Sequence, residues 1–534
     1  MKLKLYVIST NLLCASMVFS CLAEDQSQLC DQEENVNFII NDTFNLADEN
    51  TIFLHRWANF LHIKTKPITL KDESAFFLNK CQVTEEDLNE VERHLRSKKY
   101  IRDASVTYDS DNKVNIETWD NWSLLPTLEA GRKGGKNKIS IGILDRNLFG
   151  LGIDAEVEYF KNDQRSGYKF DTQFPLYLGN NTNASIRLTN NDDGSSEAVF
   201  FQKKFVSFDT ENAYKVGFDN FVQSDTQFEN GIESNRYQHQ KHSTSASWQW
   251  LHNNSAENTL RFGIGFTAEK HTFLNAFDIT DTQTSALPKD REFNYPFVSI
   301  NYVQKDYRKL QNINLINHIE DFNLGWNLTG FIGSDFSNNE GSPTAIWQSN
   351  LSKGIDISDN SLLFFNAEFE GEYYNDSTQK NRFNLKFDTQ YLYKINNNWR
   401  AFFQNTNQVS KNQFLDSPIV LGGETGVRGF PLQYKHGDSS SKFTFEARYY
   451  PHINIYKLIE LGGAAFIDTG KVFGQSEFSQ NQESSWLTSV GLGARFYSTH
   501  SSEARVIHLD LIKPVTSDSN VNSVEFRITT KHSF

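Results

Sequence analysis

Through most of this chain, apolar and polar residues alternate with a period of two, from about Trp119 to the C-terminus. Residues 383–391 are typical, because Phe, Leu, Thr and Tyr at odd positions interleave with Asn, Lys, Asp and Gln. Residues 260–269 and 169–176 follow the same rule. Successive side chains of a β-strand point to opposite faces, so the pattern predicts strands of about ten residues with one apolar face each.

The region before Trp119 has a different pattern, which predicts a small domain of helices and strands. Val36 to Ile40 is strand-like, and apolar residues between Phe53 and Leu61 recur at helical spacing until Pro67 blocks continuation. A second helix begins after Thr84, which has an acidic residue three positions on, as in a capping box. Alternation on both sides of residues 110–112 predicts a hairpin.

The first residues predict export from the cytoplasm. Lys2 and Lys4 precede an apolar stretch, residues 5–19, and small residues follow up to Ala23. This order is typical of a secretory signal peptide, which we place at residues 1–23. An uncleaved anchor and a lipid attached to Cys21 are the alternatives.

Two cysteines, Cys30 and Cys81, follow the predicted signal peptide. In an oxidising compartment they could form a disulfide that ties the N-terminal arm to the small domain, and two separate thiols are the alternative. The sequence has no CxxC or Cys/His cluster, so it predicts neither a metal site nor a cofactor.

Composition favours a membrane barrel over a soluble β-protein. Mean hydropathy is −0.55 and 38% of residues are hydrophobic, yet the chain contains 44 Phe and 20 Tyr. In a transmembrane barrel, lipid-facing and lumen-facing residues alternate, so the average stays polar while every second residue is apolar. A soluble sandwich also alternates, but long strands that end in Tyr or Trp favour the barrel. The net charge of −14 argues against a nucleic-acid partner.

The connections set the expected number of strands. Residues 396–398 suit a short turn, whereas 190–196 and 280–292 suit long loops on the opposite side of a membrane. At about 26 residues per strand and connection, residues 119–534 allow about 16 strands.

The candidate site combines a glycine-rich loop, Gly422 to Phe430, with a later strand, Phe466 to Gly470. Strand parity places Phe466 and Asp468 on the polar, lumen-facing side. A buried arginine needs a partner, because an unpaired charge costs several kcal/mol, and Asp468 is the candidate partner for Arg428. The planar guanidinium can grip a carboxylate with two bonds. An ordinary loop arginine with an unrelated aspartate is the alternative.

Other residues belong to the same prediction. Gly426 and Gly429 let the loop turn tightly and lie close to the wall. Glu446 and Arg448 share the polar face of the strand after the loop, where they either extend the network of Arg428 or simply line the lumen.

Two short motifs occur in order, Val427-Arg428-Gly429-Phe430 and then Phe466-x-Asp468-x-Gly470. This pair of motifs resembles the outer-membrane superfamily of BamA, TamA and the two-partner-secretion transporters, of bacterial surface antigen type. In that superfamily the loop folds back into a barrel and its arginine meets the strand aspartate. Residues 139–152 resemble its early hairpin, and the order strand–helix–helix–strand–strand resembles a POTRA domain. The C-terminal strand with Phe526, Ile528 and a terminal Phe534 resembles a barrel-insertion signal.

The resemblance implies a mainly β protein of a Gram-negative outer membrane. Residues 24–118 would form a periplasmic POTRA-like α+β domain, and residues 119–534 an antiparallel transmembrane β-barrel. Its partners would be outer-membrane lipids, unfolded client polypeptides and accessory periplasmic proteins. The POTRA-like edge strand would capture clients by strand addition, and the first and last barrel strands, near residues 122–130 and 524–534, would form a weak seam.

Several functions are compatible with this architecture. One is assembly or insertion of outer-membrane proteins, and the alternative is export of a secreted, haemolysin- or adhesin-like partner. A passive diffusion pore is a third. We predict no enzyme, because the sequence contains no GxSxG or HExxH, and residues 131–136 lack the spelling of a phosphate loop. His500 and its neighbouring serines are expected in a polar surface loop.

Overall fold

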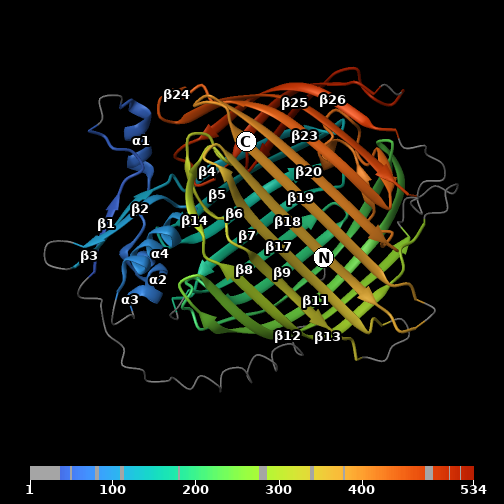
Figure 1. Cartoon of the computed structure of the whole chain (residues 1–534), viewed down its shortest axis with the longest axis horizontal. Coiled ribbons are helices and arrows are strands. Elements are labelled where there is room, and N and C mark those ends of the chain that lie inside the picture. The colour runs from blue at the N-terminus through green and yellow to red at the C-terminus, as the bar shows by residue number, and fades with distance from the viewer. Residues whose placement is uncertain are drawn as a thin grey trace, which may run out of the picture.

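The structure is a computed structural model that describes residues 36–47, 51–78, 83–108, 113–177, 181–275, 286–336, 342–376, 379–474, 485–503, 505–516 and 519–534. The predicted signal peptide, Cys21, Cys30, Cys81 and the turn at 110–112 lie outside these residues. Figure 1 shows a large barrel with a small domain at one end, which we call the domain end. The opposite end is called the far end.

The described residues of the small domain form a three-stranded sheet and four helices. The strands are β1 (Val36–Asn41), β2 (Ile101–Tyr108) and β3 (Val114–Asp120), and the helices are α1 (Phe53–Leu61), α2 (Pro67–Glu73), α3 (Ala75–Leu78) and α4 (Glu85–Arg96). The sheet order is β1-β3-β2, with β1 parallel to β3 and β2 antiparallel to it. Its core contains Leu70, Phe77, Val91, Leu95 and Ile116, all at most 1% exposed. The predicted elements are present, with α2 and α3 added between them.

Local signals explain where two helices begin. Pro67 is the first residue of α2, where its missing N–H needs no partner, so it both ends the preceding helical pattern and starts a new helix. At α4, the backbone N–H of Thr84 donates to the carboxylate of Asp87 (2.8 Å), and the backbone N–H of Asp87 donates to the hydroxyl of Thr84 (3.3 Å). The predicted capping box is confirmed.

Twenty antiparallel strands of the described chain close into a barrel. They are β4 (Leu124–Lys133), β5 (Lys136–Leu148), β6 (Ile153–Lys161), β7 (Ser166–Pro175), β8 (Thr182–Asn191), β9 (Gly194–Lys203), β10 (Asn212–Glu229), β11 (Ile232–Asn254), β12 (Asn258–Asn275), β13 (Arg291–Gln304), β16 (Asn327–Gly333), β17 (Ala345–Ser358), β18 (Ser361–Tyr373), β19 (Arg382–Lys394), β20 (Trp399–Lys411), β23 (Ser439–Tyr449), β25 (Ile459–Phe473), β26 (Leu487–Ser498), β27 (Val506–Pro514) and β28 (Glu525–Lys531). The two-residue β24 (Asn454–Ile455) pairs with the start of β25.

The prediction of about 16 strands was wrong, because the connections are shorter than assumed. Residues 190–196, expected to be a long loop, are the end of β8, a two-residue turn and the start of β9. The short turn at 396–398, between β19 and β20, is confirmed, as is the turn between β5 and β6 within residues 139–152.

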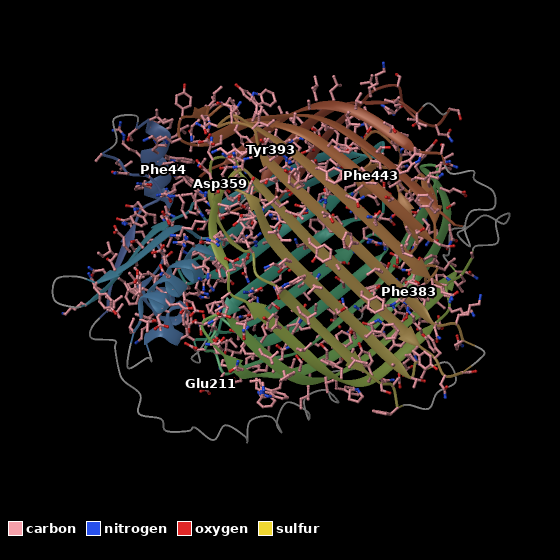
Figure 2. The ribbon with its side chains drawn as sticks, viewed as in Figure 1. Phe44, Glu211, Asp359, Phe383, Tyr393 and Phe443 are labelled. Carbon is pink, nitrogen blue, oxygen red and sulfur yellow. The ribbon has the colours of Figure 1, made fainter. Side chains whose placement is uncertain are left out.

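The predicted alternation is visible on the barrel wall. Outward apolar side chains are widely exposed, as in Leu128 (74%), Ile143 (63%) and Leu492 (66%). Their neighbours in sequence face the interior, as Phe466 and Asp468 do beside the outward Ile467. Figure 2 shows side chains such as Phe383 and Phe443 distributed along the barrel strands. Among the described residues, no helix is both long and apolar enough to cross a membrane.

The small domain contacts turns from several parts of the barrel rim. The backbone N–H of Lys66 and the hydroxyl of Thr69 both donate to the carbonyl of Gly150, each at 2.8 Å. Elsewhere the backbone N–H of Phe208 donates to Glu90 (2.7 Å). These contacts extend to the hairpin of β14 (Tyr307–Gln311) and β15 (Ile319–Asn323), where Arg96 binds Asp321 (Nε to Oδ2 3.0 Å), and to Tyr456, whose carbonyl accepts from His55 (2.8 Å). The domain therefore lies across the domain end of the barrel.

Candidate functional site

Residues 412–438 connect β20 to β23 at the far end and fold into the barrel, and we call them the lumen loop. The loop contains β21 (Ile419–Leu421), the 3-10 turn η3 (Gly423–Thr425) and β22 (Lys435–Gly437), with β21 paired to β22. Its apolar residues form a cluster with two residues of the wall: Leu421, Val427, Phe430 and Tyr434 with Val472 and Leu487. Val427 and Phe430 are 0% exposed, so burial of this cluster holds the loop inside.

The loop reaches across the lumen to the opposite wall. The side-chain carbonyl of Gln433 accepts from the backbone N–H of Phe228 at the end of β10 (2.8 Å). Arg291 of β13 donates to both carboxylate oxygens of Asp416 (2.9 and 2.8 Å). Contacts on two opposite sides of the barrel mean that the loop obstructs the far end.

Arg428 of the loop binds Asp468 of β25, as the parity argument predicted. Its Nε donates to Oδ2 (2.5 Å), its Nη2 to Oδ1 (2.8 Å), and its backbone N–H also to Oδ2 (3.3 Å). Thr444 adds a hydroxyl donor to Oδ1 (2.9 Å). Asp468 is 0% and Arg428 3% exposed. Four donated hydrogen bonds satisfy the buried carboxylate, which is the condition under which a buried ion pair is tolerated.

Glu446 and Arg448 belong to the same network. Nη2 of Arg428 lies 3.1 Å from Glu446 Oε1, and Nε of Arg448 lies 3.0 Å from Glu446 Oε2. The Arg428 guanidinium also stacks on Phe466, 3.4 Å from the ring centroid. Of the two predicted roles for Glu446 and Arg448, the structure thus places them in the network. The structure also shows that Phe466 contacts Arg428, which the sequence motif did not predict.

Three glycines let the loop approach the wall. Gly426 and Gly429 have φ of +109° and +91°, values that side-chain-bearing residues rarely adopt, so the predicted tight turn is present. A Cβ at Gly470 would lie 3.0 Å from Cγ2 of Val427 and 3.1 Å from Cδ2 of Leu421. Gly470 of the second motif therefore makes room for the apolar part of the loop.

A second segment folds inward from the domain end, and sequence reasoning missed it. Residues 312–318, which join β14 to β15, pack inside the barrel with Ile316 0% exposed. The carbonyl of Ile313 accepts from Arg448 (3.4 Å), and the carbonyl of Asn312 accepts from the Tyr450 hydroxyl (3.3 Å). Polar and apolar residues alternate from Asn312 to Leu315 as they do in a wall strand, so the period in this part did not distinguish the segment.

Phe534 does not complete the last strand. β28 ends at Lys531, and Phe534 turns inward, 3% exposed, with its ring centroid 4.9 Å from that of Tyr450. Its backbone N–H donates to the carbonyl of Asn314 (2.6 Å) in the second inward segment. Phe526 faces outward (49% exposed), and Ile528 is partly buried. Packing inside the barrel thus gives Phe534 apolar and cationic neighbours.

The barrel closes between β28 and β4 through a narrow seam. In the described residues the register of this pairing is one pair, Ile528 with Arg132, whereas β27 and β28 are in register from Val506 to Ile512. The lumen loop bridges the seam from inside. Nη1 of Arg527 donates to the carbonyl of Gly423 (3.1 Å), and that loop backbone also packs against Gly134 in the turn after β4.

The remaining candidates have structural roles. His500 lies at the interface with the small domain, its ring stacked 4.5 Å from that of Phe44, so the expected surface loop is a docking contact. No group of three or more His, Cys, Asp or Glu side chains in the described parts of the chain could hold a metal ion. The possible disulfide between Cys30 and Cys81 lies outside those parts.

Comparisons with known proteins find similarity in structure only. No family model matches the chain, and no curated protein matches it. Among solved structures it resembles BamA from Haemophilus ducreyi lacking POTRA domains 1–3, with 11% identity, 93% of this chain and 84% of that chain covered, and a TM-score of 0.38. It also resembles CdiB from Escherichia coli, with 11% identity, 87% of this chain and 74% of that chain covered, and a TM-score of 0.45. For CdiB from Acinetobacter baumannii the identity is 10%, the coverage is 92% of this chain and 73% of that chain, and the TM-score is 0.44. At these values the likeness does not assign a function.

Proposed function

We propose that this protein is an outer-membrane barrel that receives unfolded client polypeptides and assists their insertion into, or passage across, that membrane. The observation that carries the proposal is the combination of an obstructed lumen with a wall that is barely paired at one seam. The lumen loop is held by Arg428 and Asp468 and contacts β28 beside that seam. A wall built this way can open at one place while the other strand pairs stay intact.

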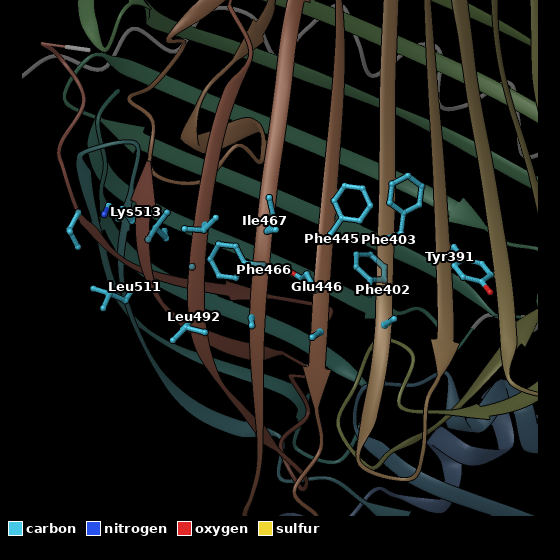
Figure 3. A pocket seen from close by; sticks show the side chains of 17 residues that line it. Tyr391, Phe402, Phe403, Phe445, Glu446, Phe466, Ile467, Leu492, Leu511 and Lys513 are labelled. Atoms are coloured by element: carbon cyan, nitrogen blue, oxygen red, sulfur yellow. The ribbon is translucent and has the colours of Figure 1, made fainter. Parts of the chain in front are cut away.

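The outward face supports membrane insertion. Apolar side chains cover it, and water would penalise their exposure by about 25 cal/mol per Å². Figure 3 shows part of this face, where Phe403, Phe445, Ile467 and Leu492 line a shallow apolar hollow on the outside of the wall. Near the domain end, the ring centroids of Trp399 and Tyr449 lie 4.7 Å apart, and transmembrane barrels have aromatic residues at this level of the wall.

The small domain suits the capture of extended polypeptides. The order β1-β3-β2 leaves β1 and β2 as edge strands of the sheet. An extended client can add to such an edge through backbone hydrogen bonds, which bind many sequences with little discrimination. We therefore assign the domain a POTRA-like role on the periplasmic side, at the entrance of the barrel.

Assembly of outer-membrane proteins is our first candidate, because the seam offers a client strand a partially unpaired β4. Export of a secreted partner through the lumen is the second, and it is favoured by the two inward segments, which could move aside together. A passive diffusion pore fits poorly, since both segments occupy the interior that a barrel of this size would otherwise leave as an aqueous channel.

A disulfide across the seam tests the proposal. Arg132→Cys with Ile528→Cys should cross-link the strands and abolish client handling until a reductant is added. Ile139→Cys with Lys161→Cys, a registered pair between β5 and β6, is the matched control and should leave activity intact. Full activity of the oxidised seam variant would show that the seam need not open.

Depletion distinguishes the two candidates. Comparison of the outer-membrane proteome with the culture supernatant should show broad loss of barrel proteins if the protein assembles them. Loss of a single supernatant protein with a normal membrane proteome would contradict assembly and support export. No change in either fraction would contradict client handling altogether.

A further inference from the structure

A cavity of about 210 Å³ lies inside the barrel between the lumen loop and the second inward segment. Gly426 and Arg428 border it on the loop side, and Ile313 and Asn314 border it on the other. The ring of Phe534 also forms part of its wall. The cavity therefore lies where two segments from opposite ends of the barrel approach each other, with wall strands forming the rest of its lining.

The lining carries a large excess of positive charge. Its cationic side chains are Arg428, Lys442, Arg448, Arg527 and Lys531, and its one side-chain carboxylate is Glu446. That carboxylate is already bound on both oxygens, by Arg428 and by Arg448. Outside the lining, Asp468 is bound by Arg428, and Oδ1 of Asp510 lies 2.7 Å from Nη1 of Arg495. Oδ2 of Asp510 lies 4.0 Å from Nη1 of Arg428, too far for a hydrogen bond. Within the lining itself, five cationic side chains thus face one side-chain carboxylate.

Several of these cations have donors without an acceptor. Nη1 of Arg428 and Nε of Arg527 are buried and have no hydrogen-bond partner within the described chain, and the two residues are 3% and 4% exposed. Lys531 forms no ion pair or side-chain hydrogen bond with any described residue, although it borders the cavity. Each buried donor left unpaired costs about 1–3 kcal/mol, and a charged one more. A ligand that accepts several hydrogen bonds at once would remove this cost.

We propose that the cavity binds a small tetrahedral oxyanion of the phosphate or sulfate class, held by Arg428, Arg527 and Lys531. Such an anion offers oxygens in several directions, which matches donors from a loop and from a strand, and guanidinium groups bind it with two bonds. The volume exceeds the roughly 30 Å³ of a water molecule and lies below the 300 Å³ or more typical of drug-sized ligands. The inward location, enclosed by the two segments, excludes a membrane lipid.

The bound anion joins the lumen loop to the last strand. Arg428 belongs to the loop, whereas Arg527 and Lys531 lie on β28, the strand at the seam. An anion shared among them stabilises the arrangement in which the loop is inside and the seam is closed. The binding itself requires only this geometry and is independent of the proposed function in client transport.

Calorimetric titration of the full-length protein in detergent with inorganic phosphate tests the proposal, with chloride held at equal ionic strength. We expect saturable binding of one phosphate, and a rise of the heat-unfolding midpoint with phosphate concentration, as linkage requires. Lys531→Gln should weaken phosphate binding roughly tenfold, the equivalent of one charge-assisted hydrogen bond. Lys386→Gln, at a lumen-facing lysine of β19 outside the cavity, is the matched control and should bind as the wild type does.

Three outcomes would overturn the proposal. The first is the absence of phosphate binding up to millimolar concentration, which would mean that water fills the cavity. The second is unchanged binding in both Lys531→Gln and Arg527→Gln, which would place the anion elsewhere. The third is acetate binding as tightly as phosphate, which would remove the preference for a tetrahedral oxyanion. If one of the two variants does not fold, the other still decides the second point.

Discussion

Arg428 and Asp468 lie 40 residues apart in the sequence, yet the guanidinium of one grips both carboxylate oxygens of the other inside the barrel. One residue comes from a loop that enters from the far end, and the other comes from the wall. Their contact therefore fixes the lumen loop to the barrel wall.

Asp468→Ala should lower the free energy of unfolding by about 3–5 kcal/mol, because it leaves Arg428 buried without its main partner. Unfolding in detergent, followed by tryptophan fluorescence across a denaturant series, measures the change. Asp171→Ala is the control, since its partner Arg187 is 61% exposed and such pairs contribute about 0–1 kcal/mol. The double variant with Arg428→Ala should lose less than the sum of the single losses, and strict additivity would contradict direct coupling.

Gly470→Ala should destabilise the closed loop by about 1–3 kcal/mol, because the new methyl group meets Val427 and Leu421 at 3.0 and 3.1 Å. Gly470→Ala should cost less in a Val427→Ala background, because that change removes the nearest of three close contacts, the third being the Ser441 carbonyl oxygen at 3.2 Å. The control is Gly463→Ala on the same strand, where the nearest atom to a new Cβ is a carbonyl oxygen at 3.7 Å. Equal effects at the two glycines, measured as unfolding midpoints, would rule out a specific fit to the loop.

Replacing residues 419–437 with a short Gly/Ser linker should raise the single-channel conductance in planar bilayers severalfold, because the far end of a 20-stranded barrel would open. Replacing residues 312–318 in the same way should have a smaller effect alone and a larger one when combined with the loop replacement. If the wild-type protein already conducts as well as the double replacement, the lumen is not obstructed, and this result would support the passive diffusion pore.

Docking of the small domain should weaken as the pH falls below about 6.5. Burial lowers the pKa of His500 to about 3, and the charges of Arg102 and His55 act in the same direction. The docked state therefore excludes a proton that an exposed histidine binds near pH 6.5, so docking is unaffected above about pH 7. The loss of docking free energy grows as the pH falls from 6.5 towards 3, and it reaches about 2 kcal/mol at pH 5.

The distance between spin labels at Ser97→Cys, in the domain, and Asn360→Cys, in a barrel turn, reports this docking. The distance distribution should broaden at acidic pH in the otherwise wild-type protein. His500→Phe keeps an aromatic ring against Phe44 but binds no proton, so its distribution should stay constant with pH. Broadening that persists in the phenylalanine variant would assign the effect to another group.

Several features followed from the sequence alone. The period of two predicted the barrel and its outward apolar face, because adjacent strand residues must point to opposite sides. The resemblance of the two motifs pointed to Asp468 as the partner of Arg428, and parity placed Asp468 on the inner face, where a buried guanidinium needs a carboxylate. Local hydrogen bonding likewise located the start of α4 at Thr84.

Only the tertiary structure decided the rest. The number of strands depends on how tightly the connections turn and where the sheet closes, and alternation carries no information on either. Residues 312–315 and Phe534 look like wall strand by their pattern, yet they lie inside because the closed barrel offers them buried partners such as Tyr450. The excess of cations around the cavity is invisible for the same reason. It arises from side chains of a loop and of several strands that come together only when the barrel is closed and the loop is inside it.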